Sequence, residues 1–156
     1  MVAYKIIETP LGVVELGIQR GKIVWCGFVE SEVNVGSAEY SLDDLLRGRG
    51  NIFKWEDLKL QGTFLQMRVW RELFNILPDE LVTYSELAAR CGYPRAVRAV
   101  ATAVGKNPIS LIIPCHRVVR KAGSGRNTTG VAAWELGNYR WGSELKKRIL
   151  EWEGII

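Results

Sequence analysis

A cysteine and the only histidine of the chain are neighbours in the stretch LIIPCHRVV. A thiol becomes a nucleophile as the thiolate, which a nearby base or positive charge favours. His116 is therefore a candidate base for Cys115, and basic side chains follow it closely. Adjacent side chains of a strand point to opposite faces, but Pro114 indicates a turn, where the two groups converge directly or through a water molecule. By itself the pair fits a buried structural cysteine better than a nucleophile.

A carboxylate near the end of the sequence is a candidate third group. The stretch SELKKRILEWEG predicts a helix with Ser143 as its N-cap and Gly154 as its end. The apolar stripe of this helix consists of Leu145, Ile149 and Trp152. Glu153 lies in the last turn, where the helix dipole disfavours a carboxylate, so we expect it to have a partner. Glu153 would orient His116, which would take the thiol proton as in a catalytic triad; the alternative is a solvated helix end.

Two short helices are predicted before this site. Thr83 and Glu86 form a T-x-x-E capping box that starts the first helix, and Gly92 ends it. Pro94 would open the second helix, because proline is tolerated at the first helical position. The buried stripe of the second helix consists of Val97, Val100, Ala101 and Val104. The pair therefore predicts a helix-turn-helix.

The outward face of the second helix suits contact with DNA. It carries Arg95, Arg98 and Thr102, with the small Ala99 and Ala103 beside them. Small side chains let the helix backbone approach a groove closely, while the arginines reach outward to the nucleic acid.

The distribution of charge supports the same interpretation. The net charge is +4, but residues 1–80 carry 9 Lys and Arg against 12 Asp and Glu, whereas residues 81–156 carry 12 against 5. A basic half is expected of a protein that binds a polyanion. The alternative is a basic surface that serves solubility alone.

The remaining composition limits the class of protein. No apolar run has the length of a membrane span, and MVAYKIIETPLG lacks the pattern of a signal peptide. The three cysteines are irregularly spaced and contain no CxxC, so they predict no disulfide framework, and with one histidine they offer no set of zinc ligands. We expect an intracellular, cytoplasmic protein with free thiols, no metal and no membrane partner.

The first part of the sequence predicts a small antiparallel sheet. Its strands are expected at residues 3–8, 12–18 and 22–29. A connector or subdomain boundary is expected near residues 47–62. A helix then begins at the N-cap Thr63 and stops at Pro78. Its stripe, expected to be core, consists of Met67, Trp70, Phe74 and Leu77.

The motif IPCHRV, preceded by GKNP and by VTYSELA…PRAVRAV, resembles the O6-alkylguanine-DNA alkyltransferases, the methylated-DNA–protein-cysteine methyltransferases. The resemblance is close over residues 63–120, resumes at GNYRWGSELKKRILEWEG and is loose at TPLGVVEL. It implies an α/β fold of two subdomains. Residues 1–60 would form a ribonuclease H-like α/β subdomain, a small antiparallel sheet with a helix. Residues 61–156 would form a mostly helical, winged helix-turn-helix-like domain that binds DNA and carries the active-site cysteine.

The resemblance also implies repair of DNA by direct reversal of damage. Cys115 would accept the alkyl group of O6-alkylguanine, and also of O4-alkylthymine, irreversibly and once per molecule, after the nucleotide is flipped out of the duplex. His116 would deprotonate the thiol through a water molecule, with Glu153 orienting the imidazole. Asn107 would hold the turn before the active-site loop. Tyr84 would lie near the flipped nucleotide, turn its phosphate and donate a hydrogen bond to the base; no cofactor or metal is implied.

The same resemblance implies the DNA contacts and the base pocket. Arg98 would fill the gap left in the base stack, and its helix would enter the minor groove. The DNA-binding set is Tyr84, Arg95, Arg98, Ala99, Thr102 and Ala103. The pocket set is Tyr84, Val118, Tyr139 and Arg140. The expected partner is double-stranded DNA that contains O6-alkylguanine, bound by a monomer, with cooperative binding on DNA left open.

The sequence departs from the family pattern in the segment before the last helix. Arg140 stands where the family usually has a small residue, Trp141 follows it, and the loop between RVVRKAGS and GNYRWG is longer. The range of accepted alkyl groups is therefore open. One alternative function is a helix-turn-helix sensor that binds alkylated bases without transfer, which the presence of Cys115 disfavours. Another is a Cys–His hydrolase, for which no oxyanion loop can be identified.

Overall fold

The computed structural model describes residues 1–30, 39–46, 52–122 and 134–156. The chain begins with an antiparallel sheet in the order β1-β2-β3. Its strands are β1 (Ala3–Thr9), β2 (Gly12–Gln19) and β3 (Lys22–Val29). Arg20 and Gly21 form the two-residue loop between β2 and β3, both with positive φ, which is the backbone that a type I′ hairpin turn requires. The three predicted strands are confirmed.

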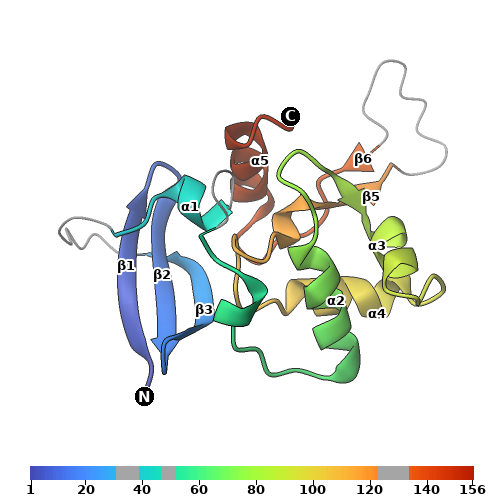
Figure 1. Ribbon diagram of the computed structural model, residues 1–156. Helices are drawn as coiled ribbons and strands as arrows, with labels where there is room; N and C mark the ends of the chain where they lie inside the picture. The colour runs from blue at the N-terminus through green and yellow to red at the C-terminus, as the bar shows by residue number, and fades with distance from the viewer. Residues whose placement is uncertain (31–38, 47–51, 123–133) are drawn as a thin grey trace.

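Helices and a second small sheet follow this N-terminal sheet. They are α1 (Leu42–Leu46), η1 (Trp55–Asp57), α2 (Phe64–Phe74), β4 (Val82–Thr83), α3 (Tyr84–Arg90), α4 (Val97–Gly105), η2 (Cys115–Arg117), β5 (Val118–Lys121), β6 (Trp134–Glu135) and α5 (Ser143–Trp152). Strand β5 lies between β4, which is parallel to it, and β6, which is antiparallel. The sheet of β1, β2 and β3 forms one side of the molecule and the helices α2, α3 and α4 the other (Figure 1). The predicted α/β class is confirmed.

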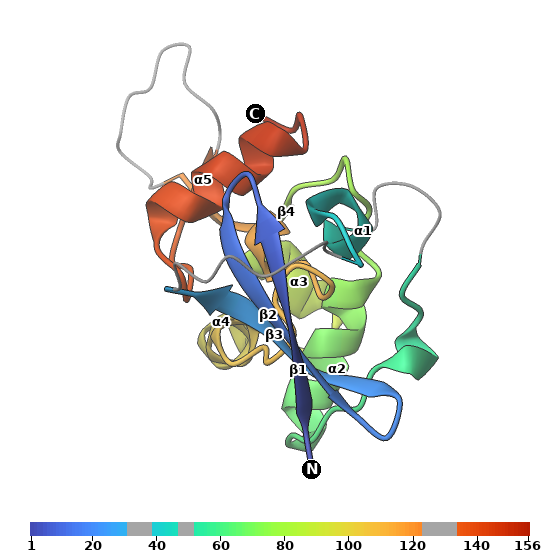
Figure 2. The same ribbon diagram turned by 90° about the vertical axis from the view of Figure 1, so that its left-hand side faces the viewer.

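The two parts of the molecule share one hydrophobic core. The buried cluster extends from Ile7 and Leu16 in the sheet, through Trp70 of α2, to Ile149 of α5. Seen from the side of the sheet, the three strands lie in front of the helices, with α5 near the top of the molecule (Figure 2). The sheet is therefore packed against the helical part of the molecule, which contains Cys115.

Helix α2 begins as predicted and ends earlier. The hydroxyl of Thr63 accepts a hydrogen bond from the amide of Gln66, which confirms the N-cap. The helix ends at Phe74, and the amides of Asn75 and Ile76 then donate to carbonyls three residues back, those of Glu72 and Leu73, in a tighter last turn. Ile76 then enters the core, whereas Leu77 is 60% exposed. The prediction that Leu77 belongs to the core is wrong.

Helix α4 begins at Val97, so the prediction that Pro94 opens it is wrong. Pro94 and Arg95 instead lie in a turn closed by a hydrogen bond from the amide of Ala96 to the carbonyl of Tyr93. The assignment of Ala103 to the DNA-contacting face is also corrected. Ala103 is 3% exposed, because α2 packs against this side of α4.

Helix α5 has the predicted range with a different cap and a different buried face. Gly142, at φ 98°, is the N-cap, and Ser143 is the first helical residue. Trp152 is 44% exposed and donates a hydrogen bond from Nε1 to Asp43, so it does not belong to the core stripe. Lys146, which the apolar pattern places on the charged face of the helix, is fully buried.

Two expectations fall on parts of the chain that the structure does not describe. They are residues 47–51 of the predicted connector and residues 123–133 of the long loop before GNYRWG. Within the described ranges, no helix combines the length and the apolar composition needed to cross a bilayer.

Candidate active site

Cys115 is placed by a short buried segment that follows α4. The side chain of Asn107 spans this segment, donating from Nδ2 to the carbonyl of Ile113 at 2.8 Å and accepting from the amide of Ile109 at 2.9 Å. Leu111 has a positive φ of 72° within it, so the backbone turns sharply. Cys115 then opens the 3-10 helix η2 and is 7% exposed. The turn predicted at Pro114 and the position predicted for Asn107 both agree with this geometry.

The environment of the Cys115 thiol has opposing effects on its acidity. Burial raises the pKa of this thiol above its ordinary value, because the charged thiolate loses solvation. The Asn107 side chain and the charges of Lys146 and Arg140 act in the opposite direction and offset part of the effect. The thiol is therefore protonated at rest, and a reaction through its sulfur needs a base.

His116 and Glu153 meet behind Cys115. The imidazole is fully buried, and its Nε2 lies 2.6 Å from Oε1 of Glu153, whose side chain is 5% exposed. Since a carboxylate accepts, Nε2 carries the proton and Nδ1 keeps its lone pair. Nδ1 is buried without a hydrogen-bond partner among the described residues. The imidazole thus has one nitrogen oriented by a carboxylate and the other available to accept a proton.

Arg117 completes this group and was not predicted from the sequence. Its guanidinium is fully buried, forms an ion pair with Glu153, and donates to the carbonyls of Ile76 at 3.1 Å and Leu46 at 3.0 Å. Burial alone would raise the pKa of Glu153, but the hydrogen bonds and charges of His116 and Arg117 lower it overall. Glu153 is therefore ionised, as it must be to orient a neutral imidazole. The helix-end carboxylate has the partner expected for it.

The single histidine allows a direct test by NMR. Burial lowers the pKa of His116 below 6.5, although Glu153 acts in the opposite direction. The folded state therefore resists protonation, so this contribution to stability is complete above pH 6.5 and is lost as the pH falls from 6.5 towards the folded pKa. We expect the imidazole C2–H resonance to titrate below pH 6.5, and the free energy of unfolding to fall over the same interval. His116→Gln should lack that fall; a midpoint at or above 6.5 would contradict the assignment.

A cavity of about 920 Å³ lies over Cys115. It extends from Asn107 and Ser110 beneath to the outer side of α4. Among the predicted residues, the lining includes Tyr84, Arg98, Thr102, Asn107, Cys115, Tyr139 and Arg140. A cysteine at its floor and an exposed arginine of α4 at its side place the reactive atom within reach of a ligand held against that helix.

Two tyrosines line this cavity, and a buried lysine holds the backbone of its wall at Asn138. Burial raises the pKa of Tyr84, the first residue of α3, and raises that of Tyr139 well above its ordinary value. The Tyr139 hydroxyl is buried and has no hydrogen-bond partner among the described residues. Lys146 donates from Nζ to the carbonyls of Val118 at 2.6 Å and Asn138 at 3.1 Å, and burial lowers its pKa to about 8. Lys146 was missed because it opens the charged run KKR of a helix, and a lysine in such a run predicts an exposed side chain.

Some predicted site residues lie away from the cavity. Val118 is fully buried and does not belong to the lining, and its carbonyl accepts from Lys146. Ala99 and Arg95 are exposed outside the lining, at and before the start of α4. Of the predicted DNA-contacting set, only Ala103 is buried.

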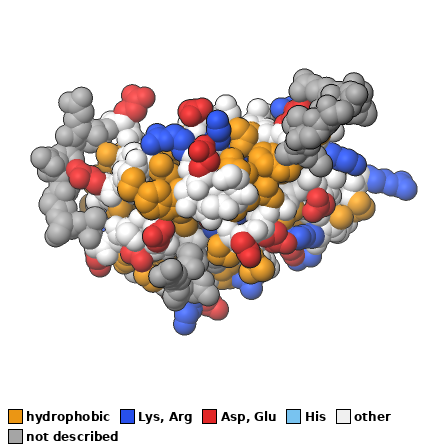
Figure 3. Space-filling model, turned by 90° about the horizontal axis from the view of Figure 1, so that it is seen from above, with side chains coloured by type: hydrophobic (Ala, Val, Ile, Leu, Met, Phe, Trp, Pro, Cys, Tyr) orange, Lys and Arg blue, Asp and Glu red, His pale blue; other side chains and the backbone are white. Residues whose placement is uncertain are grey.

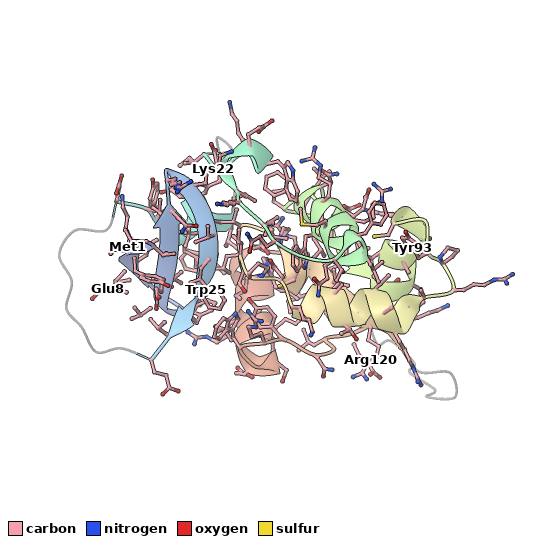
Figure 4. All side chains as sticks on the ribbon, turned by 90° about the horizontal axis from the view of Figure 1, so that it is seen from below. Met1, Glu8, Lys22, Trp25, Tyr93 and Arg120 are labelled. Carbon is pink, nitrogen blue, oxygen red and sulfur yellow. The ribbon has the colours of Figure 1, made fainter. Side chains whose placement is uncertain are left out.

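The surface formed by the outer side of α4 differs in its charged side chains from the surface on the side of α5. Seen from below, α4 lies at the surface of the molecule, between the labelled Tyr93 and Arg120 (Figure 4). Arg98, Ala99 and Thr102 are exposed on it. Seen from above, the opposite face carries acidic and basic side chains side by side around apolar atoms (Figure 3). Residues 91–110, which contain α4, carry Arg95, Arg98 and Lys106 and no Asp or Glu, so a polyanion would meet a more uniformly basic segment there.

The fold and the site define a class of protein: an α/β protein in which a buried cysteine, a histidine and a carboxylate lie behind an exposed, arginine-bearing helix. Residues 64–155 match the family described as 6-O-methylguanine DNA methyltransferase, DNA binding domain. A probable methylated-DNA–protein-cysteine methyltransferase of Acanthamoeba polyphaga mimivirus is 38% identical over 96% of this chain and 95% of its own. A methylated-DNA–protein-cysteine methyltransferase of Metallosphaera sedula is 34% identical over 100% of this chain and 96% of its own.

A solved structure agrees with these relatives. Mycobacterium tuberculosis OGT, crystallised in complex with DNA, is 30% identical with a TM-score of 0.73, covering 96% of this chain and 91% of that one. The chain belongs to the family of methylated-DNA–protein-cysteine methyltransferases.

Proposed function

We propose that this protein repairs O6-alkylguanine, and also O4-alkylthymine, in duplex DNA by moving the alkyl group to Cys115. The observation that carries the proposal is the placement of Cys115 at the floor of a cavity that reaches α4, with the His116–Glu153 pair behind it. Membership of the family supports the same reaction. A sensor without transfer would have no use for a cysteine backed by a base.

The reaction is a single displacement at carbon. His116 accepts the thiol proton at Nδ1, through a water molecule, and Glu153 stabilises the resulting imidazolium. The sulfur forms a bond to the alkyl carbon as the bond from that carbon to guanine O6 breaks, and the electron pair stays with the base. A proton donated to the base lets guanine leave as a neutral molecule. We assign this donation to the hydroxyl of Tyr84 or Tyr139, both in the cavity lining, and the proton that the imidazolium holds then returns to the tyrosine through water. The thioether has no easy leaving path, so each molecule acts once.

Reaching the alkyl group requires the nucleotide to leave the stack, at a cost of a few kcal/mol. Phosphate contacts from α4 would offset this cost without selecting a sequence, and Arg98 would fill the gap. The pair α3 and α4 with the sheet of β4, β5 and β6 fits a winged helix-turn-helix, and the sheet of β1, β2 and β3 with α1 fits a reduced ribonuclease H-like unit. We place the boundary between residues 1–60 and 61–156. A DNA substrate and three unpaired cysteines suit an intracellular, reducing location.

Peptide mass spectrometry tests the transfer directly. The protein is incubated with a duplex oligonucleotide that contains one O6-methylguanine, then digested. We expect the mass of one methyl group to appear on the peptide that contains Cys115, in an amount that stops at one per protein molecule. Binding of the duplex with no added mass on that peptide would favour a sensor and overturn the proposal.

Arg98→Ala is expected to separate extrusion of the base from the chemistry. Transfer from a duplex should slow by about tenfold or more, because extrusion costs a few kcal/mol and about 1.4 kcal/mol corresponds to a factor of ten. Transfer from a single strand, which has little stack to restore, should change much less. Stopped time courses with both substrates measure the ratio. Arg95→Ala is the matched comparison: Arg95 is exposed and does not line the cavity, so loss of a phosphate contact there should slow transfer from both substrates alike. Equal losses on both substrates would contradict the role of Arg98.

A further inference from the structure

The N-terminal sheet holds one wall of the reaction cavity through backbone hydrogen bonds. The amide of Cys26 in β3 donates to the carbonyl of Pro108 at 3.0 Å, and the carbonyl of Cys26 accepts from the amide of Ser110 at 2.9 Å. The edge of β3 thereby pairs with the segment that leads from Asn107 towards Cys115. This wall is fixed to the sheet.

The same strand packs against the second wall, which lies before α5. The indole of Trp141 meets Trp25 edge-on, with ring centroids 6.3 Å apart, and meets Phe28 at 6.2 Å. Gly27 lies between these two residues of β3, and a Cβ added there would come within 2.7 Å of the Trp141 ring. Glycine at this position is what allows the indole to lie against the strand.

Arg140 joins the two walls. Its Nη1 donates to the carbonyl of Asn107 at 3.2 Å, and the neighbouring Trp141 donates from Nε1 to the hydroxyl of Ser110 at 3.0 Å. The guanidinium also lies over the ring of Trp25, 5.5 Å from its centroid, and 5.9 Å from that of Trp141. Arg140 and Cys115 line the same cavity. Arg140 is exposed, so two indoles and one carbonyl restrict a cation that would otherwise sample many rotamers.

We propose that Trp25 is a positioning residue for the alkyl transfer: it holds the Arg140 guanidinium on the wall of the cavity that contains Cys115, and through that cation the N-terminal sheet sets the reactivity of the thiol. The role in transfer rests on the function proposed above. Figure 4 shows Trp25 where the sheet meets the rest of the molecule. The sheet is thus part of the active site even though the cysteine, the base and the carboxylate all lie after residue 60.

The electrostatics around Cys115 agree with this assignment. The positive charge of Arg140 lowers the pKa of the thiol, against the dominant effect of burial. Among the described residues, the other titratable or charged groups near the thiol or in the cavity are His116 with Glu153, Cys26 of β3, Lys146 of α5, Tyr84 of α3, Arg98 of α4, Arg120 and Lys121 of β5, and Tyr139. Within the described ranges, the indole of Trp25 meets the ring of Trp141 and the guanidinium of Arg140, so removing the indole acts on Arg140 first.

The test measures the pH dependence of Cys115 alkylation by iodoacetamide, with peptide mass spectrometry separating Cys115 from Cys26 and Cys91. For Trp25→Leu we expect the midpoint to move to higher pH and the rate at pH 7 to fall by roughly three- to tenfold, since each pKa unit changes the thiolate fraction tenfold. Trp25→Phe, which keeps a ring face, should recover part of the rate. An unchanged pH profile in a folded Trp25→Leu protein would overturn the proposal.

Two further variants separate positioning from general loosening of the fold. Arg140→Gln removes the charge itself, so it should shift the profile at least as far as Trp25→Leu, and the double variant should shift no further than Arg140→Gln. Additive shifts would overturn the proposal. Trp55→Leu is the matched control: Trp55 also carries an arginine over its ring, Arg71 at 4.8 Å, but lines a different pocket. It should leave the Cys115 profile unchanged, and an equal shift there would count against the role of Trp25.

This test does not depend on the proposed function. Iodoacetamide needs neither DNA nor a lesion, so the Trp25 profile is informative even if the unchanged protein transfers no methyl group. If the unchanged protein does transfer, the rate of methyl transfer in Trp25→Leu should fall by the same factor as its alkylation by iodoacetamide. If the unchanged protein transfers the methyl group and the pH profile of Trp25→Leu is unchanged, the proposed function stands and the role proposed for Trp25 is wrong.

Discussion

Cys115→Ser is expected to bind a duplex that contains O6-methylguanine as tightly as the unchanged protein and to transfer no methyl group. Serine is close in size to cysteine, and with 7% exposure this side chain offers the DNA almost no contact area. A hydroxyl is a far weaker acid than a thiol, so His116 cannot generate a comparable nucleophile from it. Loss of transfer should therefore be complete within the sensitivity of mass spectrometry, while the dissociation constant changes by less than about twofold.

The matched control for this variant is Cys91→Ser. Cys91 is also buried, at the end of α3, and does not line the cavity, so its replacement should leave transfer intact. Both proteins are assayed with the same labelled duplex, by gel shift for binding and by digestion for transfer. Transfer that persists in Cys115→Ser would place the acceptor elsewhere. Loss of binding together with transfer would mean that the cysteine side chain contributes to lesion recognition.

Much of the proposed catalytic group could be predicted from the sequence, because its members stand where their residue types are locally unfavourable. Glu153 stands at a helix end that disfavours a carboxylate, and this signalled a partner before any contact was known. Pro114 signalled the turn that lets Cys115 and His116 leave a strand geometry. The capping residues Thr63 and Thr83 likewise act over three residues, so their helix starts were correct.

Buried charges could not be predicted, since they depend on partners distant in the sequence. Arg117 donates to carbonyls at residues 46 and 76, and Lys146 to one at residue 118. Periodicity places a lysine or an arginine on the solvent side, and only the tertiary fold supplies the carbonyls that make burial acceptable. The contact of Trp25 with Arg140 joins two segments that are distant in the sequence, so no local pattern predicts it either.

Helix ends were the least predictable elements, for a related reason. The apolar pattern continued through Leu77 and Trp152, yet both side chains are largely exposed. The core is filled there by Ile76 and Leu150 instead. A pattern that counts apolar residues cannot tell which side of the last turn is covered by another helix.

Glu153→Gln is expected to slow transfer by about 100-fold or more, the usual size of a general acid–base contribution. The amide has no charge to stabilise the imidazolium that forms when His116 takes the thiol proton. Its NH₂ group can also donate to Nε2, which moves the imidazole proton to Nδ1 and removes the acceptor that the thiol needs. A rate measured at saturating duplex separates this effect from binding, which should be unchanged because Glu153 lies behind the cavity.

The same change should destabilise the protein, and that effect must be separated from the chemistry. Arg117 would keep its two carbonyl contacts but lose its counter-charge, and breaking a buried ion pair costs about 3–5 kcal/mol. Chemical denaturation measures this loss, and assays below the unfolding transition keep the variant folded. Glu153→Asp keeps the charge and should recover part of both rate and stability, whereas Glu151→Gln, an exposed neighbour on α5, should change neither. A Glu153→Gln protein that is folded and transfers at the unchanged rate would show that His116 works without its carboxylate.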